Sequence, residues 1–187
     1  MEHLKIIAHK ELDVLGGEPD VTQYWDENNQ KSIDILVCAD RPIDGVQSCA
    51  TIGLSEIDID MESDGKDLRI ELLGTCDIQE DIFPNIIATV AFEIMDKGEC
   101  LYGDIIENVI SEYVEKSDMK HVFLTSPFLW EGFDTLSFED KNVAWLLVVP
   151  ISDREKKYAN AHGIDALETL FDEKDVDIYD LYRDSAI

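Results

Sequence analysis

The sequence predicts an α+β fold: a mixed, largely antiparallel β-sheet flanked by helices, in a single domain spanning residues 1–187. Strand-like and helix-like segments are intermixed without the regular βαβ alternation of a parallel-sheet protein. No internal repeat, low-complexity stretch or linker rich in Pro, Gly or Ser divides the chain. A length of 187 residues with 45% hydrophobic residues suffices for one buried core.

The chain begins with a helix and continues in strands. Apolar residues recur at helical spacing within residues 2–15, and Gly16-Gly17 ends that pattern. A turn is expected at Asn28-Asn29. The strands expected around it are residues 21–25, 32–38 and 48–54.

Residues 56–62 alternate acid and hydrophobe without a break, which predicts a strand with one acidic face. Asp64-Gly65 then predicts a hairpin turn leading into a strand at 68–73. Carboxylates on one strand face would lie roughly 6.6–6.8 Å apart, about the spacing of phosphates along a nucleic-acid strand. The acids of this row are Glu56, Asp58, Asp60 and Glu62.

Two interpretations of the acidic row stay open. A basic partner that cleaves nucleic acid could bind the row in place of its substrate. Alternatively, the row belongs to a half-buried edge strand whose outward charges prevent aggregation, and we favour this interpretation.

The same region partly matches a calcium loop of the EF-hand kind. The matching residues are Asp60, Glu62, Asp64, Gly65 and Glu71, at loop positions 1, 3, 5, 6 and 12. However, Glu62 replaces the usual Asp or Asn, and the flanks predict strands where an EF-hand needs helices. We therefore favour the Asp-Gly hairpin turn, and we expect no metal and no cofactor.

The second half contains the clearest helix signals. Residues 84–96 are predicted to be helical, with Pro84 at the start and Gly98 just past the end. Ser152 and Glu155 have capping-box spacing and begin a helix that should end at Gly163. The remaining elements expected are strands at 121–125 and 143–149, a short helix at 164–172 and an acidic tail.

Aromatic residues cluster after the strand at 121–125. Phe128, Trp130 and Phe133 form either a corner of the core or an exposed anchor for a partner, and we favour the core. Trp145, inside a nearly continuous apolar strand, is also expected in the core.

Motifs of catalysis are absent from the sequence, and we expect no enzyme. There is no GxSxG elbow, no HExxH pair and no glycine-rich phosphate loop. His121 opens an apolar strand and is expected to be a buried structural histidine. The four histidines without metal-binding spacing are His3, His9, His121 and His162.

Cysteine usage and the N-terminus indicate a soluble, cytoplasmic protein. The cysteines are widely separated and form no CxxC pair, so reduced core thiols are expected. No secretory signal opens the chain, and the longest apolar run, 143–151, is too short to cross a bilayer. The four cysteines are Cys38, Cys49, Cys76 and Cys100.

The strongest compositional signal is the charge: 42 acidic against 15 basic residues give a formal net charge of −27. Such a surface repels nucleic acid and anionic lipid and accelerates encounter with basic partners. We therefore expect a protein partner, with no nucleic-acid or membrane binding. Acidity that serves only solubility or adaptation to high salt is an equal alternative.

A succession of segments, in order over roughly residues 20–187, resembles suppressor-of-fused domains. These segments are residues 51–55, 83–96, 103–106, 121–130, 145–151, 155–158, 162–168 and 177–183. The resemblance implies a mixed domain that works by binding and has no known active site. Animal members hold a transcription factor in the cytoplasm, and bacterial one-domain members resemble immunity proteins encoded beside secreted polymorphic toxins.

The leading hypothesis is therefore an immunity protein (antitoxin) that binds and neutralises a cognate toxin, expected to be a basic nuclease. The alternative is a regulatory or scaffold protein that sequesters an endogenous partner. The resemblance transfers no contact residues to this chain. The predicted contacts, chosen for their charge, are Glu56, Asp58, Asp60, Glu62, Asp172, Glu173, Asp175 and Asp177.

Overall fold

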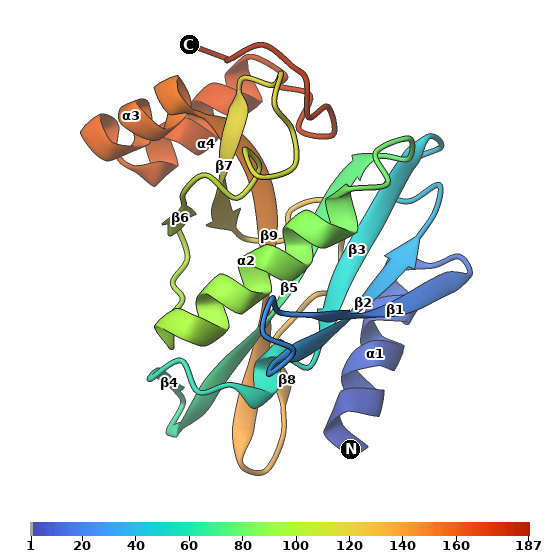
Figure 1. Ribbon diagram of the computed structural model, residues 1–187. Coiled ribbons are helices and arrows are strands. Elements are labelled where there is room, and N and C mark those ends of the chain that lie inside the picture. Colours follow the sequence, from blue (N-terminus) through green and yellow to red (C-terminus); the bar gives the residue numbers. More distant parts are fainter. Residues whose placement is uncertain (1) are drawn as a thin grey trace.

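The computed structural model describes residues 2–187 and contains one sheet with helices on both faces (Figure 1). The strands are β1 (Pro19–Trp25), β2 (Ser32–Cys38), β3 (Val46–Ile52), β4 (Glu62–Ser63), β5 (Lys66–Asp77), β6 (Ile105–Ile106), β7 (Met119–Thr125), β8 (Leu136–Ser137) and β9 (Lys141–Ser152). The helices are α1 (Glu2–Leu15), the 3₁₀ helix η1 (Leu54–Glu56), α2 (Phe83–Lys97), α3 (Asp153–His162) and α4 (Ile164–Glu173).

The sheet is mixed and largely antiparallel, as predicted. Its strand order is β1-β2-β3-β5-β9-β7-β6, with β4 paired to β5 and β8 paired to β9. Within residues 2–187 only β5 and β9 pair in parallel, and the other seven pairings are antiparallel. The α+β class and the mixed sheet expected from the sequence are therefore confirmed.

Two apolar layers hold the helices to the sheet. On one face, Ile87 and Val90 of α2 pack into a core with Ile35 and Leu72. Figure 1 shows α2 crossing this face of the sheet. On the other face, α1 and α4 contribute to a second core that includes Leu147 of β9. Burying both faces explains why β9 is a nearly continuous apolar run from Val143 to Ile151.

The contact between α2 and the sheet depends on Gly74 in β5. A Cβ atom at this position would lie 2.5 Å from Cδ1 of Ile87 and 3.0 Å from Cε1 of Phe83. Both neighbours are fully buried, so neither has free space into which it could move. A side chain at Gly74 would therefore push α2 away from the sheet.

The strand predicted over residues 56–62 is wrong. After β3 the backbone turns at Gly53, whose φ of 114° lies in the left-handed region, and η1 follows. The buried carboxylate of Glu71 accepts hydrogen bonds from the backbone N–H groups of Gly53, Leu54 and Ser55 at 2.9–3.1 Å. Within residues 56–62 the N–H groups of Glu56 and Ile57 bond back to the carbonyl oxygens of Gly53 and Leu54. The N–H of Asp60 bonds to the carboxylate of Asp58, and only Glu62–Ser63 forms a strand, β4.

Most of the turns and helix ends predicted from the sequence are confirmed. Asp64 and Gly65 have φ angles of 53° and 75° and join β4 to β5, as expected for a hairpin turn with both central residues left-handed. The capping box is present, because Ser152 Oγ accepts from the N–H of Glu155 and Glu155 accepts from the N–H of Ser152. Gly98 ends α2 in the left-handed conformation.

All four cysteines are free and buried, in agreement with the prediction of core thiols. Burial raises the pKa of each thiol above its ordinary value, and that of Cys100 to about 12. A buried thiol with a raised pKa is a poor nucleophile at neutral pH.

Candidate partner-binding site

The first group of predicted contact residues lies around η1 and β4 and is partly neutralised. Glu56 pairs with the buried Lys141 at 2.5 Å, and this hydrogen bond lowers the pKa of the carboxyl group. Asp58 pairs with Arg69 at 3.0 Å. Arg69 also pairs with Asp67 at 2.7 Å, so only the charge of Glu56 is balanced by a cation of its own.

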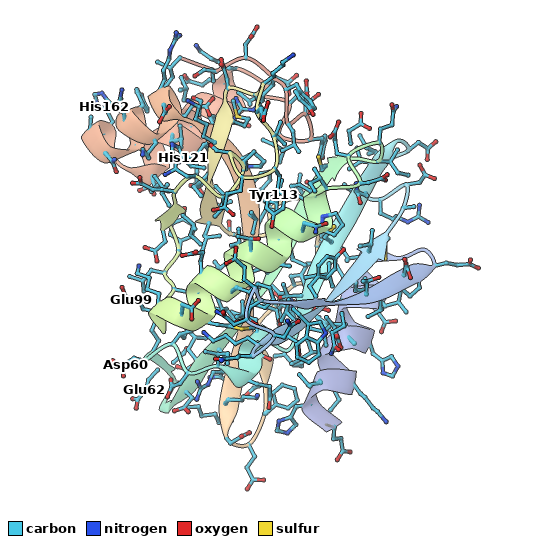
Figure 2. All side chains as sticks on the ribbon, in the orientation of Figure 1. Asp60, Glu62, Glu99, Tyr113, His121 and His162 are labelled. Carbon is cyan, nitrogen blue, oxygen red and sulfur yellow. The ribbon has the colours of Figure 1, made fainter. Side chains whose placement is uncertain are left out.

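Asp60 and Glu62 are the freer members of this group. Both are exposed, and neither forms an ion pair with any residue that the structure describes. Figure 2 shows them close together at the edge of the molecule beside β4. Because no continuous strand is present, the four carboxylates are not held at the regular spacing of a strand face. The interpretation as an evenly spaced, phosphate-like row is therefore wrong, and so is the favoured interpretation as an edge strand over residues 56–62.

The calcium-loop alternative also fails on geometry. Glu71, which would supply the essential twelfth ligand, is fully buried and accepts hydrogen bonds from Thr51 Oγ1 at 2.6 Å and from three backbone N–H groups. Burial raises the pKa of this carboxyl group. Within residues 2–187 no cluster of His, Cys, Asp and Glu side chains is arranged to hold a metal ion.

The second predicted group lies at the end of α4 and in the segment after it. Asp172, Glu173, Asp175 and Asp177 are all exposed. None of them forms an ion pair with another described residue, so their charges are available to a partner. Asp177 does accept a hydrogen bond from the N–H of Tyr179 at 3.0 Å, which fixes the local turn.

The two groups do not lie on one surface. Figure 1 places β4 and α4 at opposite ends of the molecule. A single small partner therefore cannot be expected to contact all eight acids at once. The second group has the stronger electrostatic attraction to offer, because none of its charges is paired within the chain.

A cavity of about 510 Å³ opens beside the second group. Its inner wall is apolar and includes Phe123, Val149 and Phe171. Asp172 and Asp175 also line it, so the cavity combines an apolar interior with anionic groups. Its volume falls within the range of roughly 300–1,000 Å³ that is usual for ligand pockets.

The aromatic cluster predicted as core is divided by the structure. Phe133 is buried and packs against Trp145 with ring centroids 5.4 Å apart, which confirms both as core residues. Trp130 is half-buried, with its ring 5.8 Å from that of Phe133. For Phe128 the core prediction is wrong, because its side chain is 61% exposed and borders the cavity.

The C-terminal wall of the cavity is fixed by a buried ion pair. Arg183 donates to the two carboxylate oxygens of Glu155 at 2.6 and 2.9 Å and to the carbonyl oxygen of Pro150 at 3.0 Å. Glu155 also accepts from the N–H of Ala186 at 2.8 Å. The guanidinium group lies 5.2 Å from the ring centroid of Phe171, so the chain end is tied to α3, β9 and α4.

The buried His121 is held by hydrogen-bonding partners at both ring nitrogens. The Nδ1 atom of His121 accepts from the N–H of Asn108 at 2.9 Å, and its Nε2 atom lies 3.0 Å from Asp153. This hydrogen bond, together with one from Lys120, lowers the pKa of Asp153 to about 2. Since both ring nitrogens are engaged, His121 joins β7 to α3, as the sequence predicted for a structural histidine.

Comparison with known proteins now decides the family. A family model described as suppressor of fused protein matches residues 29–184. The chain belongs to the suppressor-of-fused family. The immunity protein YqcF of Bacillus subtilis (strain 168) is 43% identical to this suppressor-of-fused chain over 185 residues, which cover 98% of this chain and 96% of YqcF. The resemblance inferred from the sequence is confirmed.

Solved structures of suppressor-of-fused proteins share the fold. A homologue from Neisseria gonorrhoeae superposes with a TM-score of 0.72 at 16% identity, covering 100% of this chain and 96% of the other. The Sufu–Fu complex gives a TM-score of 0.65 at 12% identity, covering 99% and 91%. Drosophila Suppressor of Fused gives 0.65 at 11% identity, and this chain spans 50% of its length.

Sequence reasoning found the acids of this suppressor-of-fused domain but missed the cavity beside them. The cavity joins β7 and β9 to α4 and the C-terminal segment, which are distant in sequence. The available signals were Phe128, next to a proline outside any strand, and Arg183, the single arginine of the acidic tail. A lone arginine among acids indicates a buried partner, but the sequence does not identify Glu155.

Proposed function

We propose that this suppressor-of-fused domain is an immunity protein (antitoxin) that acts by binding and neutralising a cognate toxin, without catalysing a reaction. The 43% identity to the immunity protein YqcF, over 98% of this chain, carries the proposal. Because the alignment spans nearly the whole of both proteins, it includes whatever surface the two use in common. The proposed place of action is the cytoplasm, which suits four free, buried thiols.

The proposed toxin is basic, and a nuclease of a polymorphic toxin system fits this best. The net charge of −27 favours capture of a cationic protein, and nucleases carry basic surfaces because they bind phosphates. The unpaired carboxylates of Asp172, Glu173, Asp175 and Asp177 support the same inference, because they offer charge that the chain itself does not neutralise.

In the proposed mechanism the immunity protein covers the active site of the toxin. The acidic surface would accelerate the encounter, and a small desolvated apolar centre would set the dissociation rate.

Within residues 2–187 no helix is both long and apolar enough to span a membrane.

A second candidate function is sequestration of an endogenous protein. The structure of a Sufu–Fu complex shows that a protein with this fold binds a protein partner, which supports this alternative. Purification of the tagged chain from its own host separates the two candidates. Recovery of a toxin encoded beside the gene supports immunity, whereas recovery of one endogenous regulator supports sequestration.

The proposed function is tested by co-expression with the product of the neighbouring gene, which is the candidate toxin, scoring growth and co-purification. The wild-type chain should restore growth and co-purify with the toxin. Lysine substitutions of the second group, Asp172, Glu173, Asp175 and Asp177, should weaken inhibition by about tenfold or more. The same change in the first group, Glu56, Asp58, Asp60 and Glu62, tests whether that surface also makes contact.

A control variant with the same change in net charge separates the effect of a local contact from the effect of the overall electrostatic field of the protein. Asp13, Glu18, Asp20 and Glu27 are exposed and lie outside both groups, so their substitution by lysine changes the total charge identically. A loss of protection confined to one acidic group places the interface there. No protection by the wild-type chain, with both proteins well expressed, would refute the immunity role against that toxin.

A further inference from the structure

The 510 Å³ cavity beside α4 has three properties that bear on what it could bind. Its inner wall is formed by apolar side chains that belong to the core, among them Phe123 and Phe171, whose rings meet edge to face at 6.2 Å. It is open to solvent at Ser126 and Phe128, both of which are exposed. It is also lined by Asp172 and Asp175, which have no ion-pair partner within the described chain.

Phe128 is the most exposed large apolar side chain within residues 2–187, at 61%. An aromatic ring of this kind gains free energy when a partner covers it, because its apolar area leaves water. Large aromatic residues beside a pocket are typical of the energetic centre of protein interfaces. The position of Phe128 at the cavity therefore marks where a partner would be held most tightly.

The walls of the cavity are fixed before any partner binds. The Arg183–Glu155 pair anchors the C-terminal segment that contributes Ile178 and Tyr179 to the lining. On the α4 side, Glu168 accepts hydrogen bonds from Thr125 and from Tyr102 Oη, the latter at 2.7 Å. A preformed pocket loses little conformational entropy on binding, which favours affinity.

The charge of the lining selects the class of occupant. An acidic segment would be repelled by Asp172, Asp175 and Glu168, and a purely polar segment would leave the apolar wall unfilled. An apolar side chain preceded or followed by lysine or arginine suits both the apolar wall and the carboxylates of the lining. Such a residue can bury its apolar atoms against Phe171 while the neighbouring cations approach the carboxylates.

We infer that this cavity is the anchor site of the toxin, and that it takes an apolar side chain flanked by basic residues in a surface segment of that protein. This inference rests on the proposed immunity function, to which it adds the location and chemistry of the contact. In this arrangement the cavity and Phe128 hold the bound toxin, and the second acidic group attracts the toxin before binding.

Two substitutions test the cavity directly in a binding measurement with the adjacent-gene toxin. Ser126→Trp places a large ring at the cavity mouth, and Phe128→Ala removes the exposed aromatic anchor. Each should raise the Kd by at least about tenfold, mainly through faster dissociation. The matched controls are Ser111→Trp, at another exposed serine, and Trp25→Ala, at another exposed aromatic, and both should stay within about twofold.

A second arm does not require the toxin. Isotope-labelled chain is titrated with the peptide Lys-Lys-Leu-Lys-Lys and followed by NMR, with Lys-Lys-Ser-Lys-Lys and Glu-Glu-Leu-Glu-Glu as controls. The leucine peptide with basic flanks should shift the amide signals of Ser126, Phe128 and Val149, which line the cavity. The serine peptide should perturb only residues near the exposed acids, and Ser126→Trp should abolish the cavity shifts.

The outcomes separate the two proposals. If the toxin binds the wild-type chain, Ser126→Trp and Phe128→Ala equally well, the cavity inference is overturned and the immunity function stands. If the toxin does not bind the wild-type chain, the immunity function fails, and the peptides then decide. Cavity shifts specific to the leucine peptide would retain a site for basic-flanked apolar residues, and their absence would overturn it.

Discussion

Glu11 is a carboxyl group enclosed between α1 and the sheet. It is fully buried, and Trp145 Nε1 donates a hydrogen bond of 2.9 Å to one of its oxygens. The other oxygen has no partner among the described residues. Burial, and to a lesser extent the nearby Glu71, raises the pKa of Glu11 well above its ordinary value. The folded chain therefore keeps this proton at a pH where the unfolded chain has released it.

Glu11→Gln should consequently gain stability relative to the wild type as the pH rises from 4 to 8. In the wild type, stability falls as the pH rises above the ordinary carboxyl value of about 4.3 and toward the raised pKa, because only the unfolded state ionises freely. Gln keeps the acceptor for Trp145 and carries no ionisable proton. Thermal unfolding of both proteins between pH 4 and pH 8 measures the difference, which should vanish near pH 4.

The control for this substitution is Asp13→Asn, at an exposed position of the same helix. It should leave the difference from wild type within about 0.5 kcal/mol at every pH. If Glu11→Gln gave no gain at pH 7, or a gain that grew as the pH fell, the assignment of a protonated Glu11 would be wrong.

At the scale of elements, the stability of the C-terminal segment depends on α3. Glu155 closes the capping box of that helix and also binds Arg183 and the N–H of Ala186. Arg183 is buried, so it would remain charged and without its carboxylate partner if Glu155 were removed. One side chain thus supports both the helix start and the wall of the cavity.

Glu155→Ala should therefore destabilise the protein by about 3–5 kcal/mol, as expected for breaking a buried ion pair by removing one partner. Urea denaturation provides the measurement. The comparison is Glu107→Ala, which removes an exposed carboxylate that pairs with Lys156 at 3.0 Å. That change should cost less than about 1 kcal/mol. Equal effects of the two substitutions would contradict the structural role given to Glu155.

The alternation of acids and apolar residues before β4 predicted side-chain burial correctly but strand pairing incorrectly. Burial does alternate from Glu56 to Glu62, with Ile59 fully inside, as the pattern predicted. Backbone pairing does not follow, because the N–H groups of Glu56 and Ile57 bond back to Gly53 and Leu54, and Asp60 adopts a left-handed φ of 54°. Alternation reports which side chains face the core, whereas strand pairing also depends on backbone conformation and hydrogen bonding that the pattern does not determine.

At the scale of the whole molecule, the class of fold could be predicted because it depends on local periodicity and turn residues. The helices that end at Gly98 and Gly163 and the strands β5 and β9 carry these signals strongly. The strand order could not be predicted, since the parallel pairing of β5 with β9 joins segments that are distant in sequence. The cavity escaped prediction for the same reason.

For the proposed site too, one part could be predicted from the sequence and another part could not. Composition alone indicated an anionic surface, because 42 acids in 187 residues cannot all be paired with 15 cations. It could not distinguish Glu56, which Lys141 neutralises, from Asp172 and Asp175, which are unpaired beside an apolar cavity. That distinction requires the positions of the basic side chains in the fold, and it moves the expected interface toward α4.

The proposed capture of a basic toxin by an anionic surface of this suppressor-of-fused domain should make the association rate depend on salt. Binding to the purified toxin should be followed by stopped flow between roughly 0.05 and 0.5 M NaCl. We expect the association rate constant to fall by about tenfold or more across this range, while the dissociation rate constant changes by less than about threefold. An association rate constant that does not depend on salt would refute capture by electrostatic attraction.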